Sequence, residues 1–210
     1  MIKVLITDDH PVVRQGIRQI LTEYSDIELV DEAGGGSELF EKARETRYDV
    51  ILLDISMPGK TGLELLKDVK VLCPETAVLI LSVHPETQYA IRALKSGASG
   101  YLPKSTLPDE LITAVRKAAA GKKYITSSLA DILATDFDQP DEKPIYQSLS
   151  DREFDVLIQL ASGKSIKEIG EDLSLSAKTI STYRERILEK LSLKNTAEII
   201  RFAIQEGLVD

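Results

Sequence analysis

Five polar side chains in the first half of the chain could perform chemistry together. They are the adjacent aspartates Asp8 and Asp9, the aspartate Asp54, the hydroxyl of Ser82 and the ammonium of Lys104. Clustered carboxylates repel one another unless a cation neutralises them, and Mg²⁺ is the natural candidate because it prefers hard oxygen ligands. A carboxylate nucleophile surrounded by cations and a hydroxyl suits phosphoryl transfer. The residue types therefore indicate a magnesium-dependent phosphoryl-transfer site, provided that the fold brings them together.

Each of these residues follows an apolar run that predicts a strand. The run 50–53 has four apolar residues, ends at Asp54 and is followed by the breaker Ser56-Met57-Pro58-Gly59, which is typical of a strand buried on both faces. Such runs alternate with amphipathic segments, as in a parallel sheet with helices on both sides. The expected strands are 2–7, 28–32, 50–54, 77–82 and 100–102, and the expected helices are 11–24, 36–46, 61–72, 86–96 and 107–120. Since carboxyl ends of parallel strands form the ligand crevice, the five polar residues should meet there.

Simpler interpretations exist for single residues but not for the set. Asp8, Asp9 and His10 could cap the helix that starts at Pro11, and Lys104 could be a surface charge. A phosphoaspartate hydrolase of the haloacid dehalogenase type needs a second aspartate two residues after the nucleophile, where this chain has Ser56. A nucleotide or flavin site is also disfavoured, because an Asp-Asp pair after the first strand would repel phosphate.

Residues 1–120 resemble the receiver domain of two-component response regulators. The matching residues are Asp8-Asp9, Asp54 with Met57-Pro58-Gly59 and Gly62, Ser82, Tyr101 and Lys104. The resemblance implies a flavodoxin-like, five-stranded, doubly wound α/β fold in which Asp54 accepts a phosphoryl group from a sensor histidine kinase. It further implies that Asp9, Asp54 and the backbone carbonyl of Ser56 bind Mg²⁺, with Asp8 helping through water.

The same resemblance assigns a switch to three other residues. Lys104 would pair with the phosphoryl group and Ser82 would swing to hydrogen-bond it. Tyr101 would follow inward and change the face formed by the fourth and fifth helices. Beyond phosphorylation from small donors and self-catalysed dephosphorylation, no enzymatic activity is expected.

The rest of the chain has only helical periodicity. Residues 122–137 predict one more helix, with an apolar stripe at Ile125, Leu129, Ile132 and Leu133. The acidic, proline-bearing stretch 138–144 reads as a linker, and helices are expected at about 150–162, 165–172, 176–191 and 195–206. The expected domains are a receiver at 1–121, a helix and linker at 122–148, and a small all-α domain at 149–210.

The helices at 165–172 and 177–191 are joined by a short turn, as in a helix-turn-helix. Segments such as Leu149-Ser150-Asp151-Arg152-Glu153 and Lys178-Thr179-Ile180 resemble the LuxR-type output domain, so the whole chain resembles the NarL/FixJ subfamily. The resemblance implies that the helix 177–191 enters the major groove of double-stranded DNA. Phosphate contacts are then expected from Lys178, Thr179, Arg184 and Arg186, and base contacts from Ser181, Thr182 and Glu185.

A homodimer on DNA is expected because one such domain carries little positive charge. Residues 150–210 hold 9 Lys and Arg against 11 Asp and Glu, so a single domain should bind DNA weakly and two half-sites would compensate. In relatives the last helix mediates dimer contacts, and its apolar stripe Ile199, Ala203 and Ile204 supplies the candidates, although core packing would use the same stripe.

Composition excludes several classes of protein. The net charge of −8 argues against a surface that is basic throughout, the single Cys73 excludes an internal disulfide, and no run is long enough for a membrane helix, so a cytoplasmic protein is expected. Two alternatives stay open: a receiver that acts as a phosphate-independent interaction module, and an output helix that binds protein. The sequence also leaves open whether the receiver occludes the DNA-binding helix before phosphorylation.

Overall fold

The computed structural model describes residues 1–138 and 144–209, without the side chains at 132 and 135–138. The chain divides into two compact units, Met1–Ala130 and Asp131–Asp210, and each is described by itself. The stretch 138–144 that was expected as a linker lies largely outside the described residues, as does the side chain of Ile132 in the expected apolar stripe. Among the described residues, no helix is long and apolar enough to cross a membrane.

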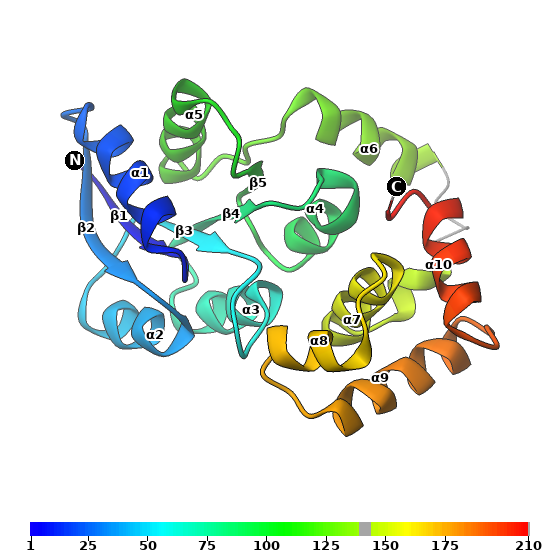
Figure 1. Ribbon diagram of the computed structural model, residues 1–210. Helices are drawn as coiled ribbons and strands as arrows, with labels where there is room; N and C mark the ends of the chain where they lie inside the picture. Colours follow the sequence, from blue (N-terminus) through cyan, green and yellow to red (C-terminus); the bar gives the residue numbers. More distant parts are fainter. Residues whose placement is uncertain (139–143, 210) are drawn as a thin grey trace. The chain divides into compact units, whose positions relative to one another are not determined.

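The first unit is built on a five-stranded, fully parallel sheet (Figure 1). Its strands are β1 (Ile2–Thr7), β2 (Ile27–Ala33), β3 (Val50–Asp54), β4 (Ala77–Ser82) and β5 (Gly100–Pro103). Their order is β2-β1-β3-β4-β5, in which the chain winds outward in both directions from β1 and β3. All residues of β3 and β4 are buried, as expected for central strands of a sheet covered on both faces. The predicted doubly wound sheet is confirmed.

Helices cover both faces of this sheet. They are α1 (Pro11–Thr22), α2 (Gly36–Glu45), α3 (Gly62–Leu72), α4 (Glu86–Lys95) and α5 (Pro108–Ala119). Apolar side chains of α1 and α5, such as Leu21 and Val115, pack with alternate strand residues such as Ile6 and Leu52 in one core cluster. The opposite strand residues face α2, α3 and α4 (Figure 1), since successive side chains of a strand point to opposite faces.

The helix after α5 starts later than its periodicity predicts. The structure has α6 at Ser127–Asp138, whereas a helix was expected from Lys122. Tyr124 instead forms a parallel bridge with Gly100 of β5, and its backbone N–H donates to the carbonyl of Ser99 at 2.7 Å. A Cβ on Gly100 would lie 2.8 Å from the carbonyl oxygen of Tyr124, so the close approach depends on the glycine. Pairing with β5 thus overrides local helical preference.

The second unit is helical in its described residues. A 3₁₀ turn at Ile145–Ser148 precedes α7 (Asp151–Ala161), α8 (Ile166–Asp172), α9 (Ala177–Lys190) and α10 (Thr196–Gln205). Ser150 and Ser165 each begin a helix with a capping box, in which a glutamate three residues later reaches back to the serine N–H. Between α8 and α9, Ser174 adopts a left-handed φ of 55°. The predicted helix-turn-helix arrangement is confirmed.

Candidate functional site

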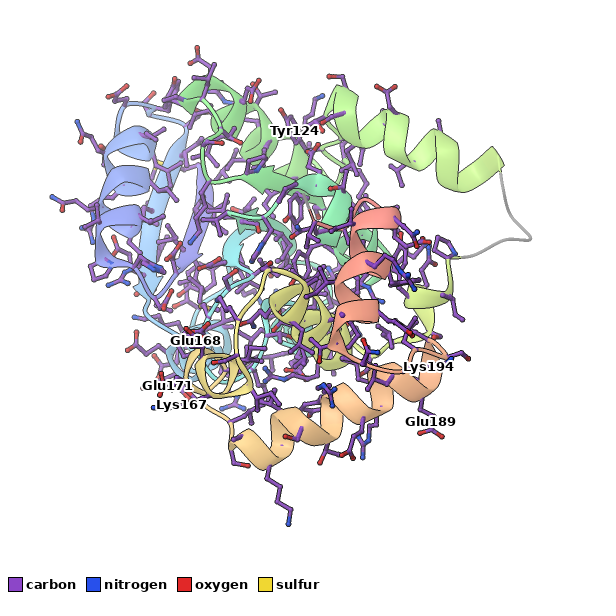
Figure 2. The ribbon with its side chains drawn as sticks, turned by 45° about the vertical axis from the view of Figure 1, so that its right-hand side comes forward. Tyr124, Lys167, Glu168, Glu171, Glu189 and Lys194 are labelled. Carbon is purple, nitrogen blue, oxygen red and sulfur yellow. The ribbon has the colours of Figure 1, made fainter. Side chains whose placement is uncertain are left out.

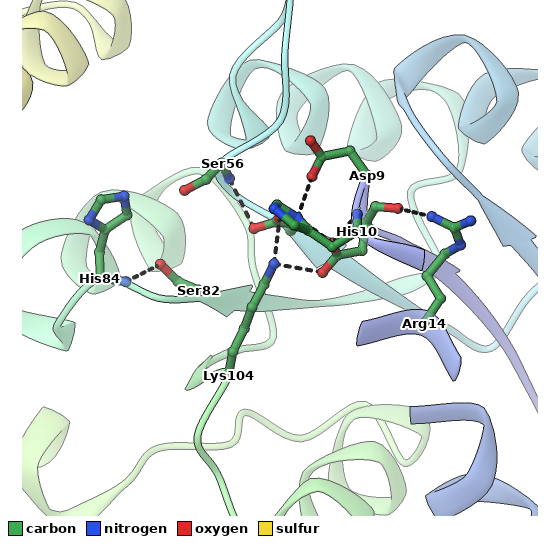
Figure 3. A network of polar contacts seen from close by, with 9 residues as sticks. Asp9, His10, Arg14, Ser56, Ser82, His84 and Lys104 are labelled. Carbon is green, nitrogen blue, oxygen red and sulfur yellow. Dashed lines mark hydrogen bonds and ion pairs between the residues drawn. The ribbon is translucent and has the colours of Figure 1, made fainter. Parts of the chain in front are cut away.

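Asp54 ends β3 at the carboxyl edge of the sheet, and its side chain is fully buried. Its carboxylate is held at both oxygens: Oδ1 accepts the Ser56 backbone N–H at 3.0 Å, and Oδ2 accepts from the Lys104 ammonium at 2.8 Å (Figure 3). Burial raises the pKa of Asp54, and the contacts with Lys104 and Ser56 offset only part of that rise. The result is a carboxylate fixed in orientation and kept from water, at the edge where ligands bind.

Lys104 follows β5 and joins two carboxylates that come from different strands. Its Nζ lies 2.6 Å from Oδ2 of Asp8 and 2.8 Å from Oδ2 of Asp54. Asp8 is also fully buried, while the Lys104 side chain is 12% exposed. Burial would lower the pKa of Lys104, but hydrogen bonds to the two carboxylates outweigh it and the pKa is raised. The ammonium therefore neutralises part of the negative charge of the carboxylate cluster.

Asp9 and His10 complete a group of possible metal ligands. One ligand atom each from Asp8, Asp9, His10 and Asp54 lies within 4.8 Å of the others. His10 Nδ1 lies 2.8 Å from Oδ1 of Asp9 and 3.2 Å from Oδ1 of Asp8 (Figure 3). Three carboxylates converging on one point are the oxygen donors that suit Mg²⁺, so the residues fit such an ion.

Two polar residues near this group were not predicted as part of it. His10 was considered only as a helix-capping residue, yet its ring contacts both aspartates. Arg14 of α1 donates from Nη1 to the carbonyl of Asp8 at 2.7 Å and from Nε to Glu32 of β2 at 3.3 Å. The available signal was the position of Arg14, four residues after the N-cap His10, which places it one helical turn further along the same face.

Ser82 and Tyr101 lie together on the β4–α4 side of the site. Ser82 is fully buried, and its hydroxyl accepts the backbone N–H of His84 at 2.9 Å. Tyr101 is fully buried as well, and its hydroxyl donates to the His84 carbonyl at 3.0 Å. These two predicted switch residues therefore bind the same loop residue, Ser82 at its N–H and Tyr101 at its carbonyl.

Gly62, the first residue of α3, allows this helix to approach the backbone at the end of β3 closely. A Cβ on Gly62 would lie 2.4 Å from the Cα of Ile55 and 2.6 Å from the carbonyl oxygen of Asp54, closer than real side chains approach backbone. Thr61 caps α3 there in a capping box with Glu64. The start of α3 therefore packs directly on the backbone that carries Asp54.

The predicted DNA-contact residues lie on α9 with different degrees of exposure. Lys178, Thr182, Glu185 and Arg186 are exposed, and Thr179 and Ser181 are half-buried. Lys178, Thr179, Thr182, Tyr183 and Arg186 line a shallow hollow. Arg184 is directed elsewhere: it is half-buried, and its Nε donates to the Thr196 hydroxyl at 2.8 Å. On the preceding helix α8, Lys167 and Glu171 form an exposed ion pair, and near the end of α9 Glu189 is exposed (Figure 2).

Two of the three predicted dimer residues are core residues of the second unit. Ile199 and Ala203 are 0% exposed, because α10 packs against α7. The expectation that Ile199 and Ala203 contact a partner subunit is therefore corrected, because the packing within one unit already buries both side chains. Ile204 is 51% exposed and is the member of the stripe that a second copy could contact.

Comparisons with known proteins agree with this architecture. The response regulator receiver domain family matches residues 4–116, and the luxR family of bacterial regulatory proteins matches residues 147–203. The response regulator UvrY of Escherichia coli strain K12 is 37% identical over 99% of this chain and 96% of its own length. The response regulator GacA of Pseudomonas aeruginosa is 36% identical over 100% of this chain and 99% of its own length.

Solved structures of a third relative match over both units. A structure of the RcsB response regulator of Salmonella typhimurium has a TM-score of 0.72 at 25% identity and covers 98% of both chains. An RcsB–DNA complex has a TM-score of 0.59 at 28% identity and covers 100% of this chain and 99% of that chain. With two family models in the order receiver then luxR, and relatives that match end to end, the chain belongs to the NarL/FixJ family of two-component response regulators, DNA-binding transcription regulators that join a receiver to a LuxR-type helix-turn-helix domain.

Proposed function

We propose that Asp54 accepts a phosphoryl group from a sensor histidine kinase, and that this modification controls the binding of the α9 helix to DNA. The observation that carries the proposal is the buried Asp54 carboxylate, held at one oxygen by Lys104 and at the other by the Ser56 N–H, beside the two aspartates that follow β1.

The transfer requires little bond chemistry from the protein beyond the nucleophile. An oxygen of the Asp54 carboxylate forms the new bond to phosphorus while the bond from phosphorus to the kinase histidine nitrogen breaks, and the electron pair stays on that imidazole. The hydrogen bonds from Ser56 and Lys104 fix the carboxylate for this attack. After transfer, the Lys104 ammonium and the Ser82 hydroxyl hold phosphoryl oxygens.

Asp8, Asp9, Asp54 and the backbone carbonyl of Ser56 would hold Mg²⁺ at the same edge. When bound, Mg²⁺ supplies positive charge to the phosphoryl oxygens. Asp8 and Asp9 give this chain the oxygen donors beside the nucleophile, and Lys104 balances their charge. Small phosphodonors such as acetyl phosphate are expected to react at the same carboxylate.

The output unit binds double-stranded DNA through α9 in the major groove. Lys178, Thr179 and Arg186 contact phosphates, and Glu185 contacts a base edge, because an exposed carboxylate is repelled by phosphate and can accept from cytosine N4. Arg184 would have to leave Thr196 to reach a phosphate. Two half-sites on a homodimer, with Ile204 in the contact, supply the affinity that one weakly charged unit lacks.

Incubation of the full chain with acetyl phosphate and Mg²⁺ tests the proposal. We expect intact mass to increase by one phosphoryl group in the wild type and not in Asp54→Asn, and the affinity for a palindromic operator to rise only in the wild type. An Asp54→Asn variant that regulates normally would support the phosphate-independent interaction module. If the full chain produces no salt-dependent gel shift with this DNA, the result would support the alternative in which the output helix α9 binds protein.

A further inference from the structure

Glu86, the first residue of α4, is a buried acid that has no part in the phosphoryl site. It is 8% exposed, and its two carboxylate oxygens accept from two hydroxyls 40 and 42 residues later in the chain. Thr126 Oγ1 donates to Oε1 at 2.7 Å, and Ser128 Oγ donates to Oε2. We call these three residues the Glu86 clasp.

The clasp holds the beginning of α6. Thr126 directly precedes this helix, and its hydroxyl oxygen also accepts the Leu129 N–H at 3.1 Å, as an N-cap does. Two residues earlier, Tyr124 is bound to β5 through Ser99 and Gly100. The first turn of α6 is therefore tied to α4 by side chains and to β5 by backbone.

Glu86 itself follows the short loop between β4 and α4, which begins after Ser82, the residue expected to move to the phosphoryl group. Only three residues separate Ser82 from Glu86, and within them His84 donates its N–H to the Ser82 hydroxyl and accepts from the Tyr101 hydroxyl. The charge of Glu86 also acts on Tyr101: burial raises the pKa of the Tyr101 hydroxyl, and the Glu86 carboxylate raises this pKa further. Ser82, His84 and Tyr101 are thus linked by hydrogen bonds, and Glu86 follows two residues after His84 in the same short segment.

We propose that Glu86 is a positioning residue that transmits displacement of the Ser82–Glu86 loop to the first turn of α6. This inference rests on the proposed phosphorylation of Asp54. When Ser82 moves to the phosphoryl group, the loop moves with it. A buried carboxylate that lost its two donors would be left unsatisfied, which is costly, so the hydroxyls of Thr126 and Ser128 follow Glu86. The helix that leads along the chain to the output unit thereby receives the signal at its N-terminus.

Hydrogen exchange of the full chain tests the coupling. The wild type, Ser128→Ala and Glu86→Ala are treated with acetyl phosphate and Mg²⁺, phosphorylation is measured by intact mass, and amide exchange is followed at residues 83–86 and 126–130. Ser128→Ala keeps the Thr126 cap, so it remains informative if Glu86→Ala folds poorly. Ser127→Ala is the matched control, because Ser127 is an exposed neighbour in the same turn.

In the wild type and in Ser127→Ala, phosphorylation should change amide exchange in both segments. In the two clasp variants, phosphorylation should still occur and residues 83–86 should still respond, but the response of residues 126–130 should shrink by about tenfold, the scale of a lost hydrogen bond to a charged group. A response of 126–130 that persists in both clasp variants overturns the inference and leaves the proposed function intact, as does a phosphorylated wild type without any response there. A wild type that gains no phosphoryl mass overturns both.

Discussion

Lys104 Nζ lies 2.8 Å from Oδ2 of Asp54, although 50 residues separate the two in the chain. The same nitrogen lies 2.6 Å from Oδ2 of Asp8. Both carboxylates are fully buried. One ammonium thus links the ends of β1, β3 and β5, and the proposed phosphoryl site is also a strongly charged part of the receiver core.

Replacing Lys104 should therefore destabilise the receiver. Lys104→Met removes the cation between two buried carboxylates, which we expect to cost about 3 kcal/mol of the free energy of unfolding. Exchange of the slowest amides of β3 and β4 in the full chain measures the loss. Lys60→Met is the control, because the Lys60–Asp68 pair, at 2.7 Å, is exposed and should contribute less than about 1 kcal/mol.

The same variant tests the metal site. With the ammonium gone, Asp8, Asp9 and Asp54 repel one another more strongly, so Mg²⁺ should stabilise Lys104→Met more than it stabilises the wild type. Equal stabilisation of the two proteins by Mg²⁺ would contradict the assignment of these carboxylates to a cation site.

Two glycines of the receiver should respond in opposite directions to a methyl group. Gly62→Ala places a Cβ 2.4 Å from the Cα of Ile55, so backbone must move and we expect a loss of at least about 2 kcal/mol. Gly16→Ala meets nothing within 4 Å on helix α1, and should stabilise the receiver by about 0.5–1 kcal/mol. Thermal unfolding of the full chain measures both. A neutral Gly62→Ala would mean that α3 does not pack on the Asp54 backbone as described.

The clustering of the residues of the proposed phosphoryl site was predictable because it depends on strand ends. Asp8, Asp54, Ser82 and Lys104 each end or follow an apolar run, and a parallel sheet brings all such ends to one edge. The roles of these residues came from the family resemblance and not from the spacing. The contacts of His10 were not predictable, since its ring could equally face solvent from the same position.

Contacts that depend on tertiary packing could not be predicted from the sequence. Residues 122–126 have helical periodicity, but a glycine at position 100 lets Tyr124 pair with β5, and nothing local signals that. The clasp of Glu86 joins residues 40 and 42 positions apart. Ile199 and Ala203 look the same in sequence whether they face a partner or α7, and only the packed unit decides between them.

Stability of the output unit should depend on Glu153 and on pH. Its side chain is 4% exposed and lies 2.6 Å from Lys190 Nζ. Burial would raise the pKa of Glu153, but Lys190 and Ser150 outweigh this and lower it. A lowered folded-state pKa contributes stability that is present above the unfolded pKa of about 4.3 and is lost as the pH falls through the folded value.

Glu153→Gln should accordingly cost about 1–3 kcal/mol at neutral pH and flatten this acid dependence. Exchange of the slowest amides of α7 and α9 in the full chain measures both effects. Glu189→Gln, on the exposed surface of α9, should match the wild type. An acid profile that is identical in Glu153→Gln and the wild type would show that this pair does not anchor α7 to α9.

Two neighbouring exposed residues of α9 should separate base readout from phosphate contact. Arg186→Ala should weaken binding to all operator sequences alike and reduce the slope of log affinity against log salt concentration by about 1, because one phosphate contact is lost. Glu185→Ala should leave that slope nearly unchanged and relax the preference at one base pair by about 1–3 kcal/mol, because a carboxylate selects the cytosine amino group and repels phosphate. Binding of each variant to a set of single-base operator variants at several salt concentrations measures both. If Glu185→Ala keeps the wild-type preference at every position, the carboxylate does not face a base, and the groove contacts must come from Ser181 and Thr182 alone.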